Sequence, residues 1–516
     1  MTQGELEKIP VQITQLFSQL EIRIMSDIVR RIKINGFSTA SADWQLTRLQ
    51  QLGKSEEDIK KWIRMALETT EEEIEKIFSD EVYEQYMKHE RAYKINGMEQ
   101  IPFEENIELQ NLIESVRRQT EETLHNITGT MGFVKQDAAG HLKAVELSEY
   151  YRTTLDNAML DIHSGAFSYN TVLMRTINEM TKSGIRWIDY DSGWHNRIDV
   201  AARRAVMTGF RQVQGKINEQ VAEQLGTDSY EVTFHVGARP THQPWQGKVW
   251  TMKQLKEICG LGTGDGLHGW NCYHDYNAFI PGVSVRTYTD RQLERMIKEE
   301  NALKTYNGKK YTTYEALQQQ RKMETTMRKT RRDIKLMEEG DANEQKVLLK
   351  KGRYYGQMQT YVDFSEKMDL PQQLDRIYQD GLKGNFSSKY AYDKEQERLE
   401  KKKQFDIIKG ELKDAGIRGK LMFEATKINI KDFEFDETHI NAERKHNITK
   451  ADAQKFIKEA KIVLERWNGQ FMNYYGENGS VYVDIKNKIV RTAFKSDEYD
   501  DSTRKIVEVM KKHEEN

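Results

Sequence analysis

Residue types that can do chemistry are concentrated first in the segment 235–274 of the chain. This segment holds both cysteines of the protein and four of its histidines: His235, His242, Cys259, His268, Cys272 and His274.

Thiolates and imidazoles at this density can form a tetrahedral zinc site. The candidate ligands are Cys259, Cys272 and His274, completed by one more histidine. The spacing argues against such a site, because no CxxC pair is present and the C-x-H pair would strain chelation by both side chains. The alternative is that the histidines and neighbouring tryptophans hydrogen-bond and pack a loop-rich core. A zinc hydrolase is disfavoured further, because no HExxH-like pair with an adjacent base occurs.

A second group of reactive residues lies near the C-terminus. His439, Arg444 and His446 fall within eight residues of each other, and Arg491 and Thr492 lie on a predicted strand. Two histidines can cleave RNA without a metal or cofactor. One takes the proton of the ribose 2'-hydroxyl, the other protonates the departing 5' oxygen, and an arginine stabilises the phosphorane. His439 and His446 are the candidate proton-transfer groups, and Arg444, Arg491 and Thr492 offer the cation and the hydroxyl. The alternative is that one histidine only caps the N-terminus of the following helix by hydrogen bonding to its backbone.

The elements that position these residues can be predicted from periodicity. The chain has only six prolines, so long helices should dominate. Apolar residues spaced three and four apart from Ile13 to Ile28 predict one amphipathic helix, and 199–220 predicts another. Alternation at 230–236 predicts a strand, followed by an irregular segment rich in Gly, Trp and His.

The region 291–404 predicts charged helices, and the pair Thr312 and Glu315 predicts a capping box where one of them begins. We expect a long solvated helical arm here, with the highly charged segment 393–404 as linker.

The last part of the chain predicts a compact α+β module. Thr449 should cap a helix whose apolar face runs from Ala453 to Leu464 and Trp467, and we expect Trp467 to lie in the core. Strands are predicted at 471–475, 481–485 and 489–494, and a final helix at 502–511.

The predicted fold is therefore multidomain. A mainly α-helical body (1–290) contains the small irregular and β segment, a charged helical arm and linker follow (291–404), and a compact α+β module ends the chain (405–516). The net charge of −2 does not indicate a duplex-DNA footprint, and two cysteines exclude a disulfide scaffold. No stretch predicts a membrane span, and the acidic start MTQGELEKIPVQ does not predict a signal peptide.

Several ordered motifs give the first three quarters of the chain a resemblance to a known family. They are RIDVAARRA at 197–205, GARPTHQPWQGKVW at 237–250, GTGDGLHGWNCYHDYNAFIPGVS at 262–284 and GKKYTTYEALQQQRKMET at 308–325. Together they resemble the phage minor capsid protein 2 family, which is similar in role to Mu F-like head morphogenesis proteins. One departure is Tyr273, where an arginine is expected.

This resemblance implies a non-enzymatic virion protein present in few copies. Its implied partners are portal and capsid proteins, and its implied location is the capsid interior or portal region, after synthesis in the cytoplasm of a bacterial host.

The C-terminal module carries a second resemblance, through HINAERKHNIT at 439–449, WNG at 467–469, YVD at 482–484 and RTAF at 491–494. These motifs resemble toxin modules attached to phage minor capsid proteins, which are grouped with polymorphic toxin type 50 and the barnase/EndoU/colicin/RelE superfold of RNases. The resemblance implies RNA as substrate, an immunity protein as a further partner, and His439, Arg444, His446 and Thr492 as active-site residues. The alternative is a purely structural virion protein, whose C-terminal module binds or decorates without turnover.

Overall fold

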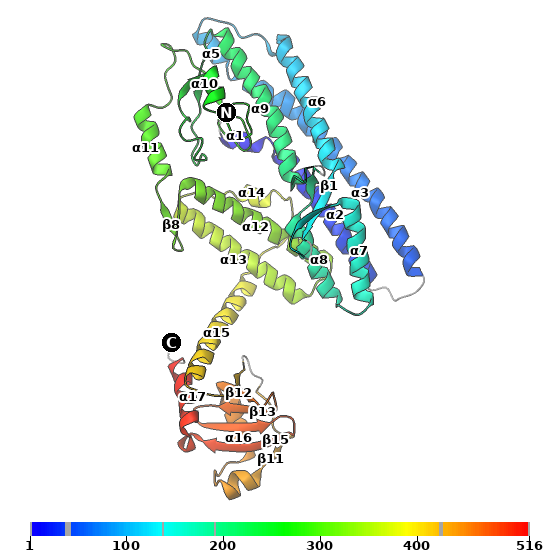
Figure 1. The fold of residues 1–516 in the computed structure, drawn as a ribbon, viewed down its shortest axis with the longest axis vertical. Helices are drawn as coiled ribbons and strands as arrows, with labels where there is room; N and C mark the ends of the chain where they lie inside the picture. Colours follow the sequence, from blue (N-terminus) through cyan, green and yellow to red (C-terminus); the bar gives the residue numbers. More distant parts are fainter. Residues whose placement is uncertain (1–2, 37–42, 137–138, 190–191, 423–426, 514–516) are drawn as a thin grey trace. The chain divides into compact units, whose positions relative to one another are not determined.

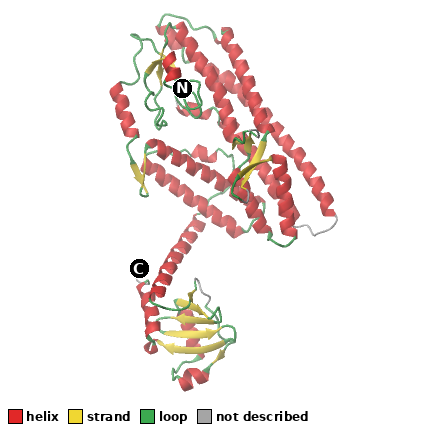
Figure 2. Cartoon of the chain, viewed as in Figure 1, coloured by secondary structure: helices red, strands yellow, loops and turns green. Residues whose placement is uncertain are grey.

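A computed structural model describes residues 3–36, 43–136, 139–189, 192–422 and 427–513. The chain forms two compact units, Met1–Tyr392 and Asp393–Asn516, and the boundary falls inside one helix, α15 (Lys389–Asp414) (Figure 1). The first unit is mainly helical with small sheets, and the second is a mixed α+β unit built on a six-stranded sheet (Figure 2). The predicted fold class is therefore confirmed. Among the described residues, no helix combines the length and apolar character needed to cross a membrane.

Helices make up most of the first unit. They are α1 (Gln3–Lys8), α2 (Val11–Gly36), α3 (Asp43–Lys76), the π-helix η1 (Ile77–Glu81), α4 (Val82–Met87), α5 (Glu90–Ile95), the 3-10 helix η2 (Phe103–Glu105), α6 (Ile107–Gly129), α7 (Leu147–His163), α8 (Tyr169–Ser183), α9 (Ile198–Gln224), α10 (Met252–Glu257), α11 (Asp290–Glu300), α12 (Thr313–Glu339), α13 (Glu344–Met368) and α14 (Leu374–Tyr378).

The largest core of this unit lies between long helices that are distant in sequence. The predicted helix from Ile13 to Ile28 is α2, and most of its apolar stripe, including Phe17 and Ile24, is buried. The predicted helix at 199–220 is α9, which packs against both α2 and α6. Burial of such stripes supplies most of the stability of a helical unit, because helix propensity alone is weak.

Three small sheets complete the described part of the first unit. The first has the order β2-β1-β3-β4, the second β6-β5-β7, and the third is the hairpin β8-β9. Their strands are β1 (Met131–Gln136), β2 (Leu142–Glu146), β3 (Arg186–Ile188), β4 (His195–Arg197), β5 (Ser229–Val232), β6 (Val249–Thr251), β7 (Tyr276–Ala278), β8 (Lys304–Tyr306) and β9 (Lys309–Tyr311).

The charged region after residue 290 is helical, as predicted, and Thr312 forms the predicted capping box with Glu315 at the start of α12. The prediction that this region is solvated is wrong for α12. Arg331 and Arg332 are each only 4% exposed, because α12 packs against α13, α8 and α2. Arg331 forms an ion pair with Asp380 at 2.9 Å, and Arg332 pairs with Glu21 of α2. A charge-rich sequence is buried here because its charges are paired.

The second unit contains one sheet in the order β10-β12-β13-β14-β15-β11, antiparallel except for the pair β11 and β15. Its elements after α15 are β10 (Lys420–Leu421), β11 (Glu434–Phe435), the π-helix η3 (Thr438–Glu443), α16 (Lys450–Glu459), β12 (Ile462–Arg466), β13 (Phe471–Tyr475), β14 (Gly479–Asp484), β15 (Ile489–Lys495), the 3-10 helix η4 (Ser496–Glu498) and α17 (Asp501–Lys512).

Both faces of this sheet are covered. On β14, Val481 and Val483 belong to the core beneath α16, whereas Tyr482 between them packs in the core beneath α17. This alternation follows from the two-residue period of a strand. The second unit therefore has its own hydrophobic core on each side of the sheet.

Two sequence predictions for this unit need correction. Thr449 caps α16, as predicted, and forms a capping box with Asp452, but the helix ends at Glu459. Leu464 lies on strand β12, because the β-branched Ile462 and Val463 before it favour a strand over a further helical turn. Trp467 follows that strand at a turn with φ of 53° and is 80% exposed, so it is not a core residue.

Candidate functional site

The histidine- and cysteine-rich segment forms the loops of the sheet β6-β5-β7. Because β5 pairs with both β6 and β7, the loop between β5 and β6 lies against the loop that precedes β7. Tight backbone approach within the second loop requires glycine: a Cβ on Gly266 would lie 2.1 Å from the carbonyl oxygen of Gly260. Sheet pairing and close loop packing thus bring together residues that are far apart in sequence.

Three polar side chains from these loops meet in the interior. The Sγ atom of Cys272 lies 3.5 Å from Nδ1 of His274 and 3.9 Å from Nδ1 of His242, and the two Nδ1 atoms are 3.4 Å apart. All three residues are buried, with 6%, 2% and 2% of their surfaces exposed for Cys272, His242 and His274. The structure therefore joins two of the predicted zinc ligands to His242.

The third predicted ligand, Cys259, lies outside this group of three although it belongs to the same hydrophobic cluster as Cys272. Cys259 is 1% exposed and packs in a hydrophobic cluster with Leu255 and Leu267. Burial raises the pKa of its thiol to about 12. The rings of His242, His274 and Trp245 are in mutual contact, so histidines and a tryptophan pack against one another in this loop-rich core.

The outer nitrogens of the two histidines each have an oxygen partner. Nε2 of His242 lies 2.8 Å from the carbonyl oxygen of Asp265, and Nε2 of His274 lies 2.9 Å from Oε1 of Gln246. The same Oε1 accepts a hydrogen bond from the backbone N–H of His235 at 3.1 Å. Burial lowers the pKa of His242, His274 and His235, the last to about 4, so all three imidazoles are neutral near pH 7.

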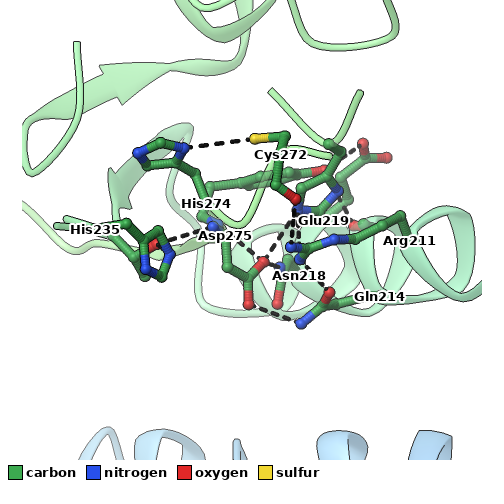
Figure 3. A network of polar contacts seen from close by, with 12 residues as sticks. Arg211, Gln214, Asn218, Glu219, His235, Cys272, His274 and Asp275 are labelled. Atoms are coloured by element: carbon green, nitrogen blue, oxygen red, sulfur yellow. Dashed lines mark hydrogen bonds and ion pairs between the residues drawn. The ribbon is translucent and has the colours of Figure 1, made fainter. Parts of the chain in front are cut away.

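Asp275, next to His274, is the centre of a buried hydrogen-bond network (Figure 3). Its Oδ1 accepts from Nδ2 of Asn218 at 3.0 Å, from the backbone N–H of Tyr276 at 2.9 Å and from Nε2 of His268 at 3.2 Å. Its Oδ2 accepts from Nε2 of Gln214 at 2.8 Å. Burial alone would raise the pKa of Asp275, but these hydrogen bonds and nearby positive charge hold it well below its ordinary value.

Arg211 of α9 supplies that charge and connects the network to Cys272. Its Nη1 donates to Oε1 of Gln214 at 2.7 Å, and its Nη2 donates to the carbonyl oxygen of Cys272 at 3.2 Å. Arg211 is 4% exposed, and burial lowers its pKa. Side chains of α9 therefore fix the loop at both Cys272 and Asp275, on either side of His274.

In the second unit, the structure gives His446 a carboxylate partner that sequence analysis missed. Nδ1 of His446 lies 2.6 Å from Oε2 of Glu498, and its ring lies 5.6 Å from that of Phe494. The His446 side chain is 15% exposed. Glu498 is far from His446 in sequence and lies in η4, directly after β15, so local spacing could not connect them.

The other predicted catalytic residues lie on elements that contact each other. His439 is in η3, which packs against β15, the strand that carries Thr492. Nδ1 of His439 lies 3.2 Å from Oε2 of Glu443, and the backbone N–H of Arg444 donates to the carbonyl oxygen of His439 at 3.1 Å. Arg444 is exposed and Thr492 is half-buried. Their assignment to one active site stays a prediction.

Comparison with protein families places this chain among the structural proteins of phage virions. Residues 1–363 match the family described as phage minor capsid protein 2. The match covers well over half of the sequence, and the chain belongs to the phage minor capsid protein 2 family. The resemblance of the first three quarters is thus confirmed, and the family implies a virion location and capsid proteins as partners. The matched region ends before the second unit, and comparisons with curated proteins and with solved structures gave no match.

Proposed function

We propose that this minor capsid protein lies at the portal and in the head interior, and that its second unit is a metal-independent endoribonuclease directed against host RNA. The pairing of His446 with Glu498 carries the proposal. A carboxylate that accepts the Nδ1 proton of an imidazole fixes its tautomer and leaves Nε2 able to take a proton.

Each predicted residue has a role in this reaction. Nε2 of His446 takes the proton of the ribose 2'-hydroxyl, whose oxygen attacks the adjacent phosphorus. Protonated His439 donates a proton to the departing 5' oxygen, so that a 2',3'-cyclic phosphate and a free 5'-hydroxyl form. Arg444 neutralises the phosphorane and Thr492 donates a hydrogen bond to it. The exposed side chains of Arg444 and Lys445, next to His446, favour an RNA backbone as the ligand.

Residues 393–516 are suited to a direct test, because this unit has its own cores on both faces of the sheet. The purified fragment should cleave bulk RNA and tRNA with EDTA present, most rapidly between about pH 5 and 8, since two imidazoles must hold opposite protonation states. His446→Ala or His439→Ala should each lower the rate by roughly 100- to 10,000-fold.

A second histidine–carboxylate pair in the same unit gives a matched control. Nε2 of His513 lies 3.1 Å from Oε2 of Glu411, so His513→Ala removes a similar pair outside the proposed site and should leave the rate unchanged. If the folded wild-type fragment neither cleaves RNA nor slows bacterial growth, the nuclease proposal fails. The second unit is then a binding or decoration module without turnover. An active unit would also require a partner immunity protein in any bacterium that produces it.

A further inference from the structure

The buried group formed by His242, Cys272 and His274 has the dimensions of a metal site. Zinc binds nitrogen at about 2.0–2.1 Å and sulfur at about 2.3 Å. In a regular tetrahedron these bond lengths separate two nitrogens by about 3.4 Å and a nitrogen from a sulfur by about 3.6 Å. The observed Nδ1–Nδ1 distance is 3.4 Å, and the two Nδ1–Sγ distances are 3.5 and 3.9 Å. Two of the three separations match these values, and the third exceeds its value by about 0.3 Å.

The hydrogen bonds around the histidines determine which nitrogens can bind a cation. Gln246 presents its amide oxygen to His274, because the same oxygen accepts the backbone N–H of His235. Nε2 of His274 therefore carries the proton of this ring. Nε2 of His242 also carries a proton, because it donates a hydrogen bond to the carbonyl oxygen of Asp265. In both neutral rings Nδ1 is then an unprotonated acceptor. The two Nδ1 atoms and the sulfur of Cys272 beside them therefore offer three donor atoms to one cation.

The surroundings match those of known metal ligands. A histidine that binds a metal through one nitrogen usually donates its other N–H to a carbonyl or carboxylate oxygen, which holds the ring in place. Both histidines do this here, and Arg211 holds the backbone of Cys272. The strain expected from the C-x-H spacing is avoided, because an irregular loop carries these residues and Asn271 adopts φ of 55°.

We propose that Nδ1 of His242, Nδ1 of His274 and Sγ of Cys272 bind one zinc ion, with a water molecule as fourth ligand. One thiolate with two imidazoles suits zinc, and the thiol of Cys272 releases its proton to solvent on binding. The ion joins the loop between β5 and β6 to the loop before β7, so its role is to stabilise the first unit. Cys259 is not a ligand in this site.

The test uses the full-length protein, purified under reducing conditions and analysed for zinc, copper and iron. After zinc loading and removal of free metal, wild-type protein should hold about one zinc per chain. Cys272→Ser and His242→Gln should each hold less than a tenth of this amount. Cys259→Ser removes the other buried thiol of the same hydrophobic cluster, and it should retain the zinc. Stripping zinc with a chelator should lower the midpoint of thermal unfolding of wild type and Cys259→Ser, and returning zinc should restore it.

The outcomes separate the possibilities clearly. Cobalt substitution should give wild-type protein a sulfur-to-cobalt charge-transfer band that is absent from Cys272→Ser, and this readout reports ligation directly even if one variant is less stable. The proposal is overturned if zinc-loaded wild type holds no zinc, if it holds copper or iron instead, or if folded Cys272→Ser or His242→Gln still holds stoichiometric zinc. Loss of zinc from Cys259→Ser would also overturn it. None of these measurements depends on the nuclease proposal for the second unit.

Discussion

Replacing Asp275 by asparagine should strongly destabilise the first unit. The substitution removes the negative charge that compensates buried Arg211 and turns one acceptor oxygen into a donor. We expect the asparagine oxygen to take the place of Oδ1 and accept its three hydrogen bonds. The asparagine NH2 group then takes the place of Oδ2 and faces another donor, Nε2 of Gln214, which lies 2.8 Å from Oδ2 in the wild type. Gln214 cannot rotate to correct this, because its own oxygen accepts from Arg211. Leaving a buried hydrogen-bond donor without an acceptor costs about 1–3 kcal/mol, and more when a charged group is lost, so we expect a loss at the upper end of this range.

Urea unfolding of the full-length protein, followed by tryptophan fluorescence, measures this loss. Every tryptophan except Trp467 belongs to the first unit, so the signal reports mainly on it. The control is Asp265→Asn, whose side chain is 92% exposed and which should change the free energy of unfolding by less than about 0.5 kcal/mol. A loss below about 1 kcal/mol for Asp275→Asn would refute the reasoning.

The same variant should change how stability depends on pH. The pKa of Asp275 is lowered by folding, so its contribution is present above the unfolded-state pKa of about 3.9 and is lost as the pH falls towards the folded-state value. Wild-type stability should therefore decrease below about pH 4 more steeply than that of Asp275→Asn. Parallel decreases for the two proteins would contradict this account.

Two further substitutions test other parts of the fold. Glu21→Gln should lower the free energy of unfolding in urea by about 3–5 kcal/mol, because Glu21 is 1% exposed and its carboxylate pairs with both Arg197 and Arg332. A loss within the error of the measurement would show that these charges are not desolvated. Thr449→Ala should lower the stability of the fragment 393–516 by about 0.5–2 kcal/mol in thermal unfolding. Thr449→Ser keeps the capping hydroxyl and should lower the stability less. Equal losses of stability for the two variants would contradict the capping role.

The sequence predicted features that depend on neighbouring residues. The helix caps at Thr312 and Thr449 involve groups three positions apart, and the buried stripe of α2 repeats every three or four residues. Such patterns are set by helix geometry and need no knowledge of the tertiary structure. The helical class of the first unit and the α+β class of the second could be predicted for this reason.

Features that depend on pairing between distant segments could not be predicted. His242 meets Cys272 only because β5 pairs with both β6 and β7, and Glu498 meets His446 only after β15 has joined the sheet. The prediction that Trp467 lies in the core was wrong for a similar reason. It assumed that the helix continues to Trp467, but the segment before this residue is strand β12, which pairs with β13. Tertiary pairing overrode the local pattern in each case.

The strand order of the second unit also determines when this unit can fold during synthesis. Its two edge strands, β10 and β11, precede the four strands between them in the sequence. The central strands β12 to β15 are joined by short turns and can pair as they leave the ribosome, but β11 must wait for β15, the last strand made. Long-range pairing of this kind is slow compared with the formation of hairpins. The sheet, and with it the contact between His446 and Glu498, therefore closes only after β15 and Glu498 have been translated.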